Sequence, residues 1–155
     1  MPPSILYDLS QYDLEKVAYG IDSIRDANPQ RGDMEHLNAI IHLGPEGAIA
    51  FKDVRPDEFW VPGHVPGRPL LPGVVMIEAA AQLASFYTKV QQRWDGFIGF
   101  GGVDGVKFRQ SVSPGVRMYV LVKLIRSRHG RITCDSQGIV NGNVVFEAQI
   151  TGTRV

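Results

Sequence analysis

Residues 74–92, with the sequence VVMIEAAAQLASFYTKVQQ, constrain the fold more than any other stretch of the chain. They are rich in helix-forming residues, and Pro72-Gly73 directly before them is a natural helix entry. A helix that is apolar on nearly every side has to be buried on most of its faces. The sequence therefore predicts one central helix that the rest of the chain must cover.

The residues on either side of this helix favour antiparallel strands. Strands are expected at residues 37–43, 48–54, 115–127, 131–140 and 143–152. Asn141-Gly142 is a strong two-residue hairpin signal. Residues 4–19 suggest one or two short helical turns, and the polar run 25–36 suggests a loop. A buried helix with an antiparallel sheet around it predicts an α+β fold, in a single domain over residues 1–155.

Composition is that of an ordinary globular protein. The 155 residues are 44% hydrophobic and 21% charged, which excludes an intrinsically disordered chain. The longest apolar stretch, 73–90, is interrupted by Glu78, Gln82 and Lys89 and is a poor membrane span. A single cysteine, Cys134, allows no internal disulfide and fits a reducing compartment. With no secretory pattern at the start, we expect a cytoplasmic protein without a membrane or nucleic-acid partner.

Charge is balanced over the whole chain but unevenly distributed. Residues 1–63 hold 11 acidic and 5 basic residues, whereas residues 104–155 hold 3 acidic and 8 basic ones. The basic C-terminal third is suited to an acidic partner. The alternative is a solvated strand surface with no partner.

Glu78 is the most informative polar residue, because it lies about one and a half turns into the apolar helix. A buried carboxyl group must be paired or neutral, since an isolated charge is costly to bury, and a neutral carboxyl can donate a proton. Gln82, one turn later on the same face, can orient it. The alternative is a structural carboxylate that pairs with a buried base or reaches solvent.

His64 lies in the segment 59–73, which carries four prolines and three glycines in fifteen residues. Proline fixes the backbone, so this loop is expected to be ordered and to hold an imidazole in one place. Histidine is the usual general base near neutral pH. The alternative is a structural or simply exposed histidine.

Gly73 at the helix entry is the third candidate. The first turn of a helix offers unpaired N–H groups, and glycine lets a ligand approach the backbone closely. A thioester carbonyl placed there would be polarised, and its α-proton would become more acidic. The alternative is a plain Pro-Gly helix start, and Gly73 taken by itself favours that alternative. Together, His64, Gly73 and Glu78 suggest proton abstraction next to a carbonyl.

Two longer runs carry a family resemblance. GHVPGRPLLPGVVMIEAAAQ at 63–82 and FGGVDGVKFRQSVSPG at 100–115 resemble the motifs of the β-hydroxyacyl-acyl-carrier-protein dehydratases of the FabZ type, and NPQRGDMEHLNAI at 28–40 resembles a third motif weakly. The resemblance implies a hot-dog fold, in which a long central helix is wrapped by an antiparallel β-sheet. It also implies a homodimer as the smallest working unit, often assembled into a trimer of dimers.

The resemblance assigns roles to residues of this chain. The catalytic histidine of the family falls on His64, the catalytic acid on Glu78 and the helix-entry amide on Gly73. Val74 would offer a backbone carbonyl to the histidine ring, and Gln82 matches a glutamine of the family. The implied reaction converts a (3R)-3-hydroxyacyl chain on an acyl carrier protein to the trans-2-enoyl chain. It implies no metal and no organic cofactor.

The stiff loop and more than one helical turn separate His64 from Glu78, so we expect the two to meet across the two-fold axis of a dimer. Basic residues expected to meet the acidic surface of a carrier protein are Arg68, Lys107, Arg109, Arg126 and Arg128. Two alternatives stay open: an acyl thioesterase on the same fold, and a non-catalytic subunit that binds acyl carriers. The second is kept open by the altered motif at 28–40. Acyl chain length, pathway and the higher oligomer are not specified by the sequence.

Overall fold

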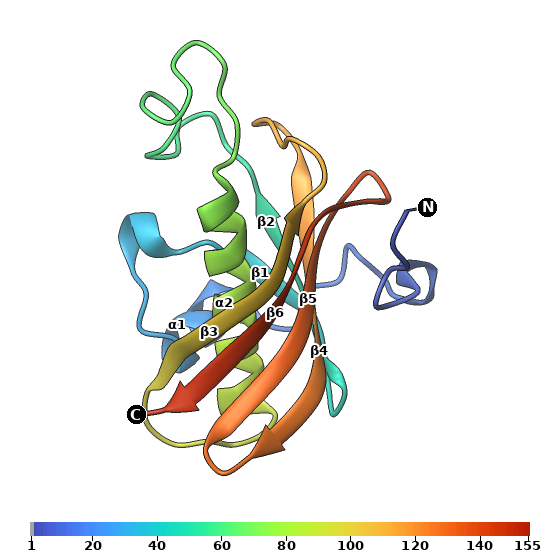
Figure 1. Ribbon diagram of the computed structural model, residues 1–155, viewed down its shortest axis with the longest axis vertical. Helices are drawn as coiled ribbons and strands as arrows, with labels where there is room; N and C mark the ends of the chain where they lie inside the picture. The colour runs from blue at the N-terminus through green and yellow to red at the C-terminus, as the bar shows by residue number, and fades with distance from the viewer. Residues whose placement is uncertain (1) are drawn as a thin grey trace.

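The computed structural model, in which residues 2–155 are described, consists of one sheet and one long helix (Figure 1). All strand pairs are antiparallel, in the order β1-β2-β4-β5-β6-β3. The strands are β1 (Ala39–Gly44), β2 (Gly47–Asp53), β3 (Ile98–Phe108), β4 (Arg117–Arg128), β5 (Arg131–Val140) and β6 (Asn143–Arg154). The long helix is α2 (Gly73–Val90), and a short helix α1 (Ile21–Ala27) precedes β1. Short 3-10 turns occupy Leu9–Gln11 and Gly32–Met34.

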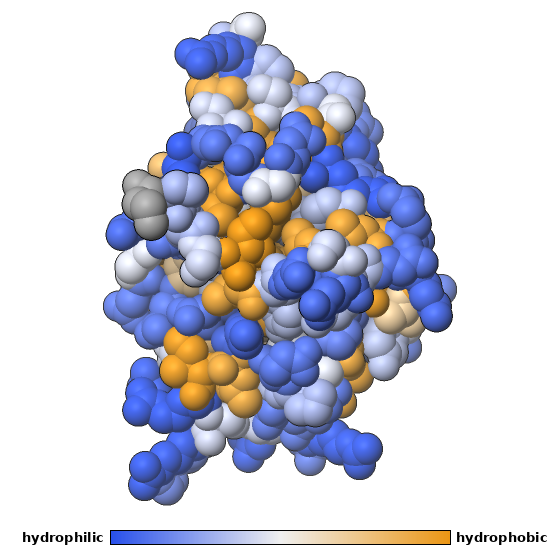
Figure 2. Space-filling view, turned by 90° about the vertical axis from the view of Figure 1, so that its right-hand side faces the viewer, coloured by the Kyte–Doolittle hydropathy of each residue, from blue (hydrophilic) through white to orange (hydrophobic). Residues whose placement is uncertain are grey.

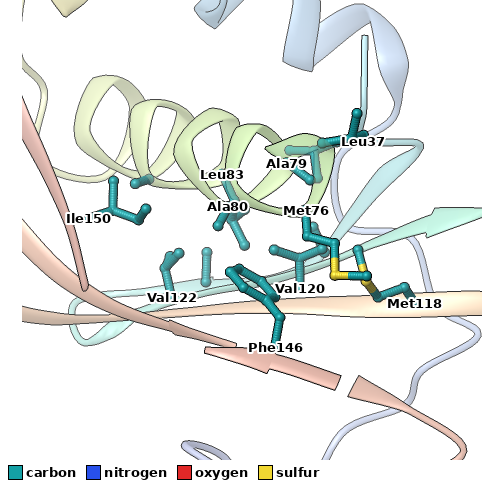
Figure 3. Packing of buried hydrophobic residues seen from close by; sticks show 14 of the residues in the cluster. Leu37, Met76, Ala79, Ala80, Leu83, Met118, Val120, Val122, Phe146 and Ile150 are labelled. Atoms are coloured by element: carbon teal, nitrogen blue, oxygen red, sulfur yellow. The ribbon is translucent and has the colours of Figure 1, made fainter. Parts of the chain in front are cut away.

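The main core lies between α2 and the face of the sheet that it covers (Figure 3). Ala79, Ala80 and Leu83 of the helix are fully buried, and they face side chains such as Val120 on β4 and Phe146 on β6. The two alanines let the helix backbone approach the sheet closely, while Leu83 fills the space between strands. Truncating a leucine in such a core costs about 2–5 kcal/mol, so the helix is firmly held against the sheet.

The opposite face of the sheet is covered by the N-terminal segment, residues 3–14. Tyr7 is buried there among Ile49, Phe51 and Leu121, and its hydroxyl donates a hydrogen bond to the carbonyl of Val122 at 2.8 Å. Figure 2 looks onto this side of the molecule and shows hydrophobic side chains gathered in its centre between polar ones. The N-terminal segment thus adds a second, smaller core to the outer face.

The α+β architecture and the hot-dog arrangement predicted from the sequence are confirmed, because the sheet curves around α2 (Figure 1). Strands β1, β2, β4, β5 and β6 lie within a few residues of the predicted ranges. Asn141 and Gly142 both have positive φ, 51° and 78°, as their hairpin turn requires.

Two elements were not predicted: the short helix α1 and the strand β3. Strand β3 contains four glycines, which strands normally disfavour, and its pairing with β6 is interrupted by two register shifts. It pairs on one side only, because it lies at the edge of the sheet. Two apolar side chains of β3, Phe100 and Phe108, are exposed, and so is Phe97 directly before the strand.

The connection between β2 and α2, residues 54–72, rises beyond the end of the helix (Figure 1). It carries His64 and leads directly into Gly73. Among the described residues, no helix combines the length and hydropathy needed to cross a membrane.

Candidate active site

His64 is held by the backbone of its own loop. Its amide donates to the carbonyl of Trp60 at 2.9 Å, and its ring Nδ1 lies 2.9 Å from the carbonyl oxygen of Leu70. A carbonyl oxygen can only accept, so this contact places the ring proton on Nδ1 in the neutral imidazole. The other nitrogen, Nε2, then has its lone pair available on a solvent-accessible ring. This is the tautomer that a general base requires.

Within one chain, the carbonyl that holds the histidine ring is that of Leu70, and the role of the Val74 carbonyl stays a prediction. Val74 lies inside the first turn of α2. Carbonyl groups within a helix point along its axis toward the C-terminal end, away from the loop that carries His64. Leu70 precedes the helix and lies outside regular secondary structure, so its carbonyl is free to bind the ring. Val74 nevertheless lies beside the histidine, with a side chain that is 72% exposed.

The N-terminus of α2 faces the same region. Val75 and Met76 donate their amides to the carbonyl of Pro72, while the amides of Gly73 and Val74 have no hydrogen-bond acceptor within residues 2–155. A Cβ atom on Gly73 would lie 2.6 Å from the ring of Phe108. Glycine is therefore required here for close packing, and it leaves the first amide of the helix accessible.

A cavity of about 490 Å³ joins these features. His64, Gly73 and Phe108 line it together, along with Leu70, Leu71, Val74, Met76, Arg109, Gln110 and Ser111. The base and the helix-entry amide predicted from the sequence are thus brought to one cavity, with an aromatic side chain from the end of β3 as its wall.

Glu78 is half-buried on α2, and Gln82 orients its carboxyl group as the spacing predicted. The side-chain Nε2 of Gln82 donates to Glu78 Oε2 at 2.7 Å and to the carbonyl of Met34 at 2.6 Å. The side-chain oxygen of Gln82 accepts from the amide of His36 at 3.0 Å. With all three of these contacts made, the Gln82 amide is fixed, and it leaves the second oxygen of Glu78 available for proton transfer.

Glu78 lines a different cavity from His64. This narrower cavity, of about 100 Å³, runs along α2 beside β3 and includes Glu78, Gln82, Phe97, Ile98 and Phe100 among its lining residues. Gln30 reaches it too, and the side-chain oxygen of Gln30 is buried without a hydrogen-bond partner among the described residues. Within one chain, the predicted base and the predicted acid are therefore not brought to a shared cavity.

The basic residues expected to dock a carrier protein do not form one surface in a single chain. Arg68 is exposed on the loop, and Arg109 lines the His64 cavity while it pairs with Glu147 at 3.1 Å. Arg126 and Arg128 lie at the β4–β5 hairpin, at the opposite end of the sheet from the loop (Figure 1). Among residues 2–155, no three His, Cys, Asp or Glu side chains form a group suited to a metal ion.

Three contributors to the site were missed by sequence reasoning: Leu70, Phe108 and Gln30. Leu70 acts through its backbone carbonyl, which no side-chain pattern reveals. Phe108 lies in the run at 100–115 that carried the family resemblance, so a signal was present. Gln30 lies in the altered motif at 28–40, where the match is weak.

Residues 28–149 match the family described as the FabA-like domain. The chain is 34% identical to the 3-hydroxyacyl-(acyl-carrier-protein) dehydratase FabZ of Polynucleobacter necessarius over 137 residues, which are 87% of this chain and 92% of the relative. It is also 34% identical to the FabZ of Dichelobacter nodosus over 145 residues, with 86% and 95% of the two chains covered.

Solved structures with much lower identity share the fold. A chain of the dehydratase heterocomplex ApeI:P from Xenorhabdus doucetiae superposes with a TM-score of 0.73 at 14% identity, covering 85% of this chain and 90% of that one. Cj0977, a sigma28-regulated virulence protein from Campylobacter jejuni, gives 0.67 at 13% identity, covering 89% and 94%. At these identities the similarity bears on the fold alone.

Proposed function

This chain belongs to the FabA-like family, among the FabZ-type 3-hydroxyacyl-(acyl-carrier-protein) dehydratases, and from this premise we propose that it dehydrates (3R)-3-hydroxyacyl thioesters on an acyl carrier protein. The observation that carries the proposal is the His64 ring, which the Leu70 carbonyl holds as a base in the same cavity as the accessible amide of Gly73. A base beside an oxyanion donor is the arrangement that removal of a proton next to a carbonyl requires.

In the proposed reaction, Nε2 of His64 removes a proton from C2 of the acyl chain. The negative charge that develops on the thioester oxygen is stabilised by the Gly73 amide at the positive end of α2. The C2–C3 double bond forms as the C–O bond at C3 breaks. No external oxidant or reductant is needed, because the reaction only eliminates water.

Glu78 supplies the proton that turns the C3 hydroxyl into a leaving water molecule. Gln82 binds Oε2 of Glu78, so Oε1 is the oxygen that transfers the proton. After the elimination, His64 carries a proton and Glu78 has lost one, and transfer of a proton from His64 to Glu78 restores both groups. Gln82 is thus a positioning residue for the acid.

The two groups act together in a homodimer, in which His64 of one subunit faces Glu78 of the other. Two features support this. First, the groups line different cavities within one chain. Second, β3 is an edge strand beside both cavities, and Phe100 and Phe108 on it, with Phe97 directly before it, are about half exposed. An edge strand with exposed apolar residues is suited to pairing with a second copy, which would bring the two cavities together.

Turnover of a panel of 3-hydroxyacyl thioesters tests the reaction. We expect the enoyl product, followed by its ultraviolet absorbance, on both carrier-bound and short soluble thioesters, with higher kcat/KM for the carrier-bound ones. A thiol reagent in a parallel assay reports hydrolysis. Release of free thiol without enoyl product would favour the thioesterase alternative. The absence of both activities would favour the non-catalytic subunit.

A further inference from the structure

A buried group of charged and polar side chains lies where the loop that carries His64 meets β2, and none of its members lines either of the two cavities. Lys52 on β2 and Glu58 in the loop are 3% and 7% exposed, and Lys52 Nζ lies 2.6 Å from Glu58 Oε1. His36 is 2% exposed, and its Nδ1 lies 3.5 Å from the same ammonium group. A buried ion pair seldom stabilises a fold more than well-packed apolar residues would, so its presence calls for another explanation.

Glu58 connects this group to His64. Glu58 Oε2 accepts from the amide of Arg55 at 2.8 Å, and Oε1 accepts from the indole Nε1 of Trp60 at 3.2 Å. The Trp60 carbonyl in turn accepts from the amide of His64. The Glu58 carboxylate therefore fixes the first turns of the loop. Through Trp60, it also helps to hold the backbone of His64, the proposed base.

His36 connects the same group to Glu78. The His36 ring faces Lys52, and the His36 amide donates to the side-chain oxygen of Gln82, whose other end binds Glu78. Burial and the charge of Lys52 lower the pKa of His36 to about 4, so its ring is neutral and its Nδ1 can accept from the ammonium group. Hydrogen bonds and the Lys52 charge outweigh burial and lower the pKa of Glu58, so this carboxyl is ionised.

We propose that Lys52 and Glu58 are positioning residues for both the base and the acid. Glu58 anchors the loop that carries His64. Lys52 contacts His36, whose backbone amide binds Gln82 and so keeps Gln82 hydrogen-bonded to Glu78. The kinetic part of this inference rests on the proposed function. A misplacement of about 1 Å in a reacting group can cost on the order of a hundredfold in rate, so loss of the anchor should be visible in kcat.

The test replaces both charges at once, in a Lys52→Met/Glu58→Gln variant, because a single replacement would leave an uncompensated buried charge. We expect kcat to fall by about tenfold or more, while KM stays within about twofold of wild type. Should the double variant not fold, Trp60→Phe removes one hydrogen bond from the same carboxylate and should lower kcat by about threefold or more.

A second readout does not depend on the substrate. In 15N-histidine NMR spectra, with the His64 signal identified by its loss in His64→Ala, wild type should show the Nδ1–H tautomer that the Leu70 carbonyl selects. The double variant should shift this population toward the Nε2–H tautomer. If the proposed reaction were wrong, this measurement would still decide whether the ion pair positions His64.

The matched control is Asp53→Asn/Arg117→Gln, which removes an ion pair one residue further along β2. That pair has an N–O distance of 2.7 Å, and its side chains are 35–39% exposed. Among residues 2–155, neither side chain forms a hydrogen bond or ion pair with Glu58 or His36. The control should keep kcat within about twofold of wild type and leave the His64 tautomer unchanged. The proposal would be overturned if a folded Lys52→Met/Glu58→Gln variant kept both the kcat and the His64 tautomer of wild type. It would also be overturned if the control variant lost as much kcat as the double variant.

Discussion

At the scale of single residues, the proposed chemistry depends on two side chains whose orientation is set by a neighbour. The carbonyl of Leu70 sets the tautomer of His64, and the amide of Gln82 sets the orientation of Glu78. In both cases the neighbour uses an atom that cannot itself act as the acid or base. The residues to test are therefore His64 and Glu78, with their neighbours expected to have smaller effects.

Removal of either reacting group should abolish most of the activity. His64→Ala and Glu78→Gln are each expected to lower kcat by about a hundredfold or more, the usual scale for general acid–base groups. Glu78→Gln can still accept the hydrogen bond from Gln82 through its amide oxygen, so its thermal unfolding should resemble that of wild type. Turnover near the wild-type level in either variant would exclude the mechanism, and an unfolded Glu78→Gln would point to a structural carboxylate instead.

Arg68 is the exposed basic residue of the loop that carries His64, so it is the first candidate for contact with an acidic carrier protein. Arg68→Glu should raise KM for carrier-bound substrate and leave short soluble thioesters unaffected. Because screening acts over about 8–10 Å at ordinary ionic strength, added salt should reduce the difference between wild type and variant. Lys16→Glu, at an exposed position just after the N-terminal segment, is the control. Equal effects of Arg68→Glu on both substrate types would remove Arg68 from the docking surface.

At the scale of elements, the sequence was most informative where one periodicity dominates. Helix α2 and the β5–β6 hairpin were predicted because an apolar helical stretch and an Asn-Gly turn are strong local signals. Strand β3 was missed because its glycines mask the strand pattern, and its place is set by pairing with β6. The contact between Lys52 and Glu58 was also missed, since it forms only when the loop folds back over β2.

The segment around His36 gives a pH-dependent contribution to stability. The pKa of His36 is lowered from 6.5 to about 4 by burial and by Lys52, against the opposite effect of Glu58 and Asp33. Between these two pH values the unfolded chain binds a proton that the folded chain does not, so stability falls as pH decreases from about 6.5 to about 4. At 1.36 kcal/mol per pH unit, the contribution is at most about 3 kcal/mol.

Urea unfolding at several pH values between 4 and 7 measures this contribution. His36→Gln keeps the backbone amide that binds Gln82 and removes the titrating ring, so its stability should change less with pH than that of wild type. Protonation of carboxyl groups elsewhere in the chain lowers the free energy of unfolding at low pH in both proteins. The difference between the two curves of unfolding free energy against pH therefore isolates the contribution of His36. Parallel curves would show that His36 does not titrate in this range.

At the scale of the whole molecule, the separate cavities of His64 and Glu78 lead to a prediction of complementation. In a mixed dimer of His64→Ala and Glu78→Ala chains, one site would carry both substitutions and the other would carry neither. Random reassembly of equal amounts makes about half of the dimers mixed, so about a quarter of wild-type activity should return. No recovery after verified subunit exchange would place both groups of each site in one subunit, and it would leave their acid–base roles intact.

The N-terminal segment has a consequence for where this protein can be cut. Similarity to the FabA-like domain begins at residue 28, yet residues 3–14 pack Tyr7 and its neighbours onto the outer face of the sheet. A truncation at the similarity boundary would uncover Ile49, Phe51 and Leu121 at once, and exposed apolar patches of this kind promote association. The folded unit therefore begins well before residue 28, where the match to the FabA-like domain starts.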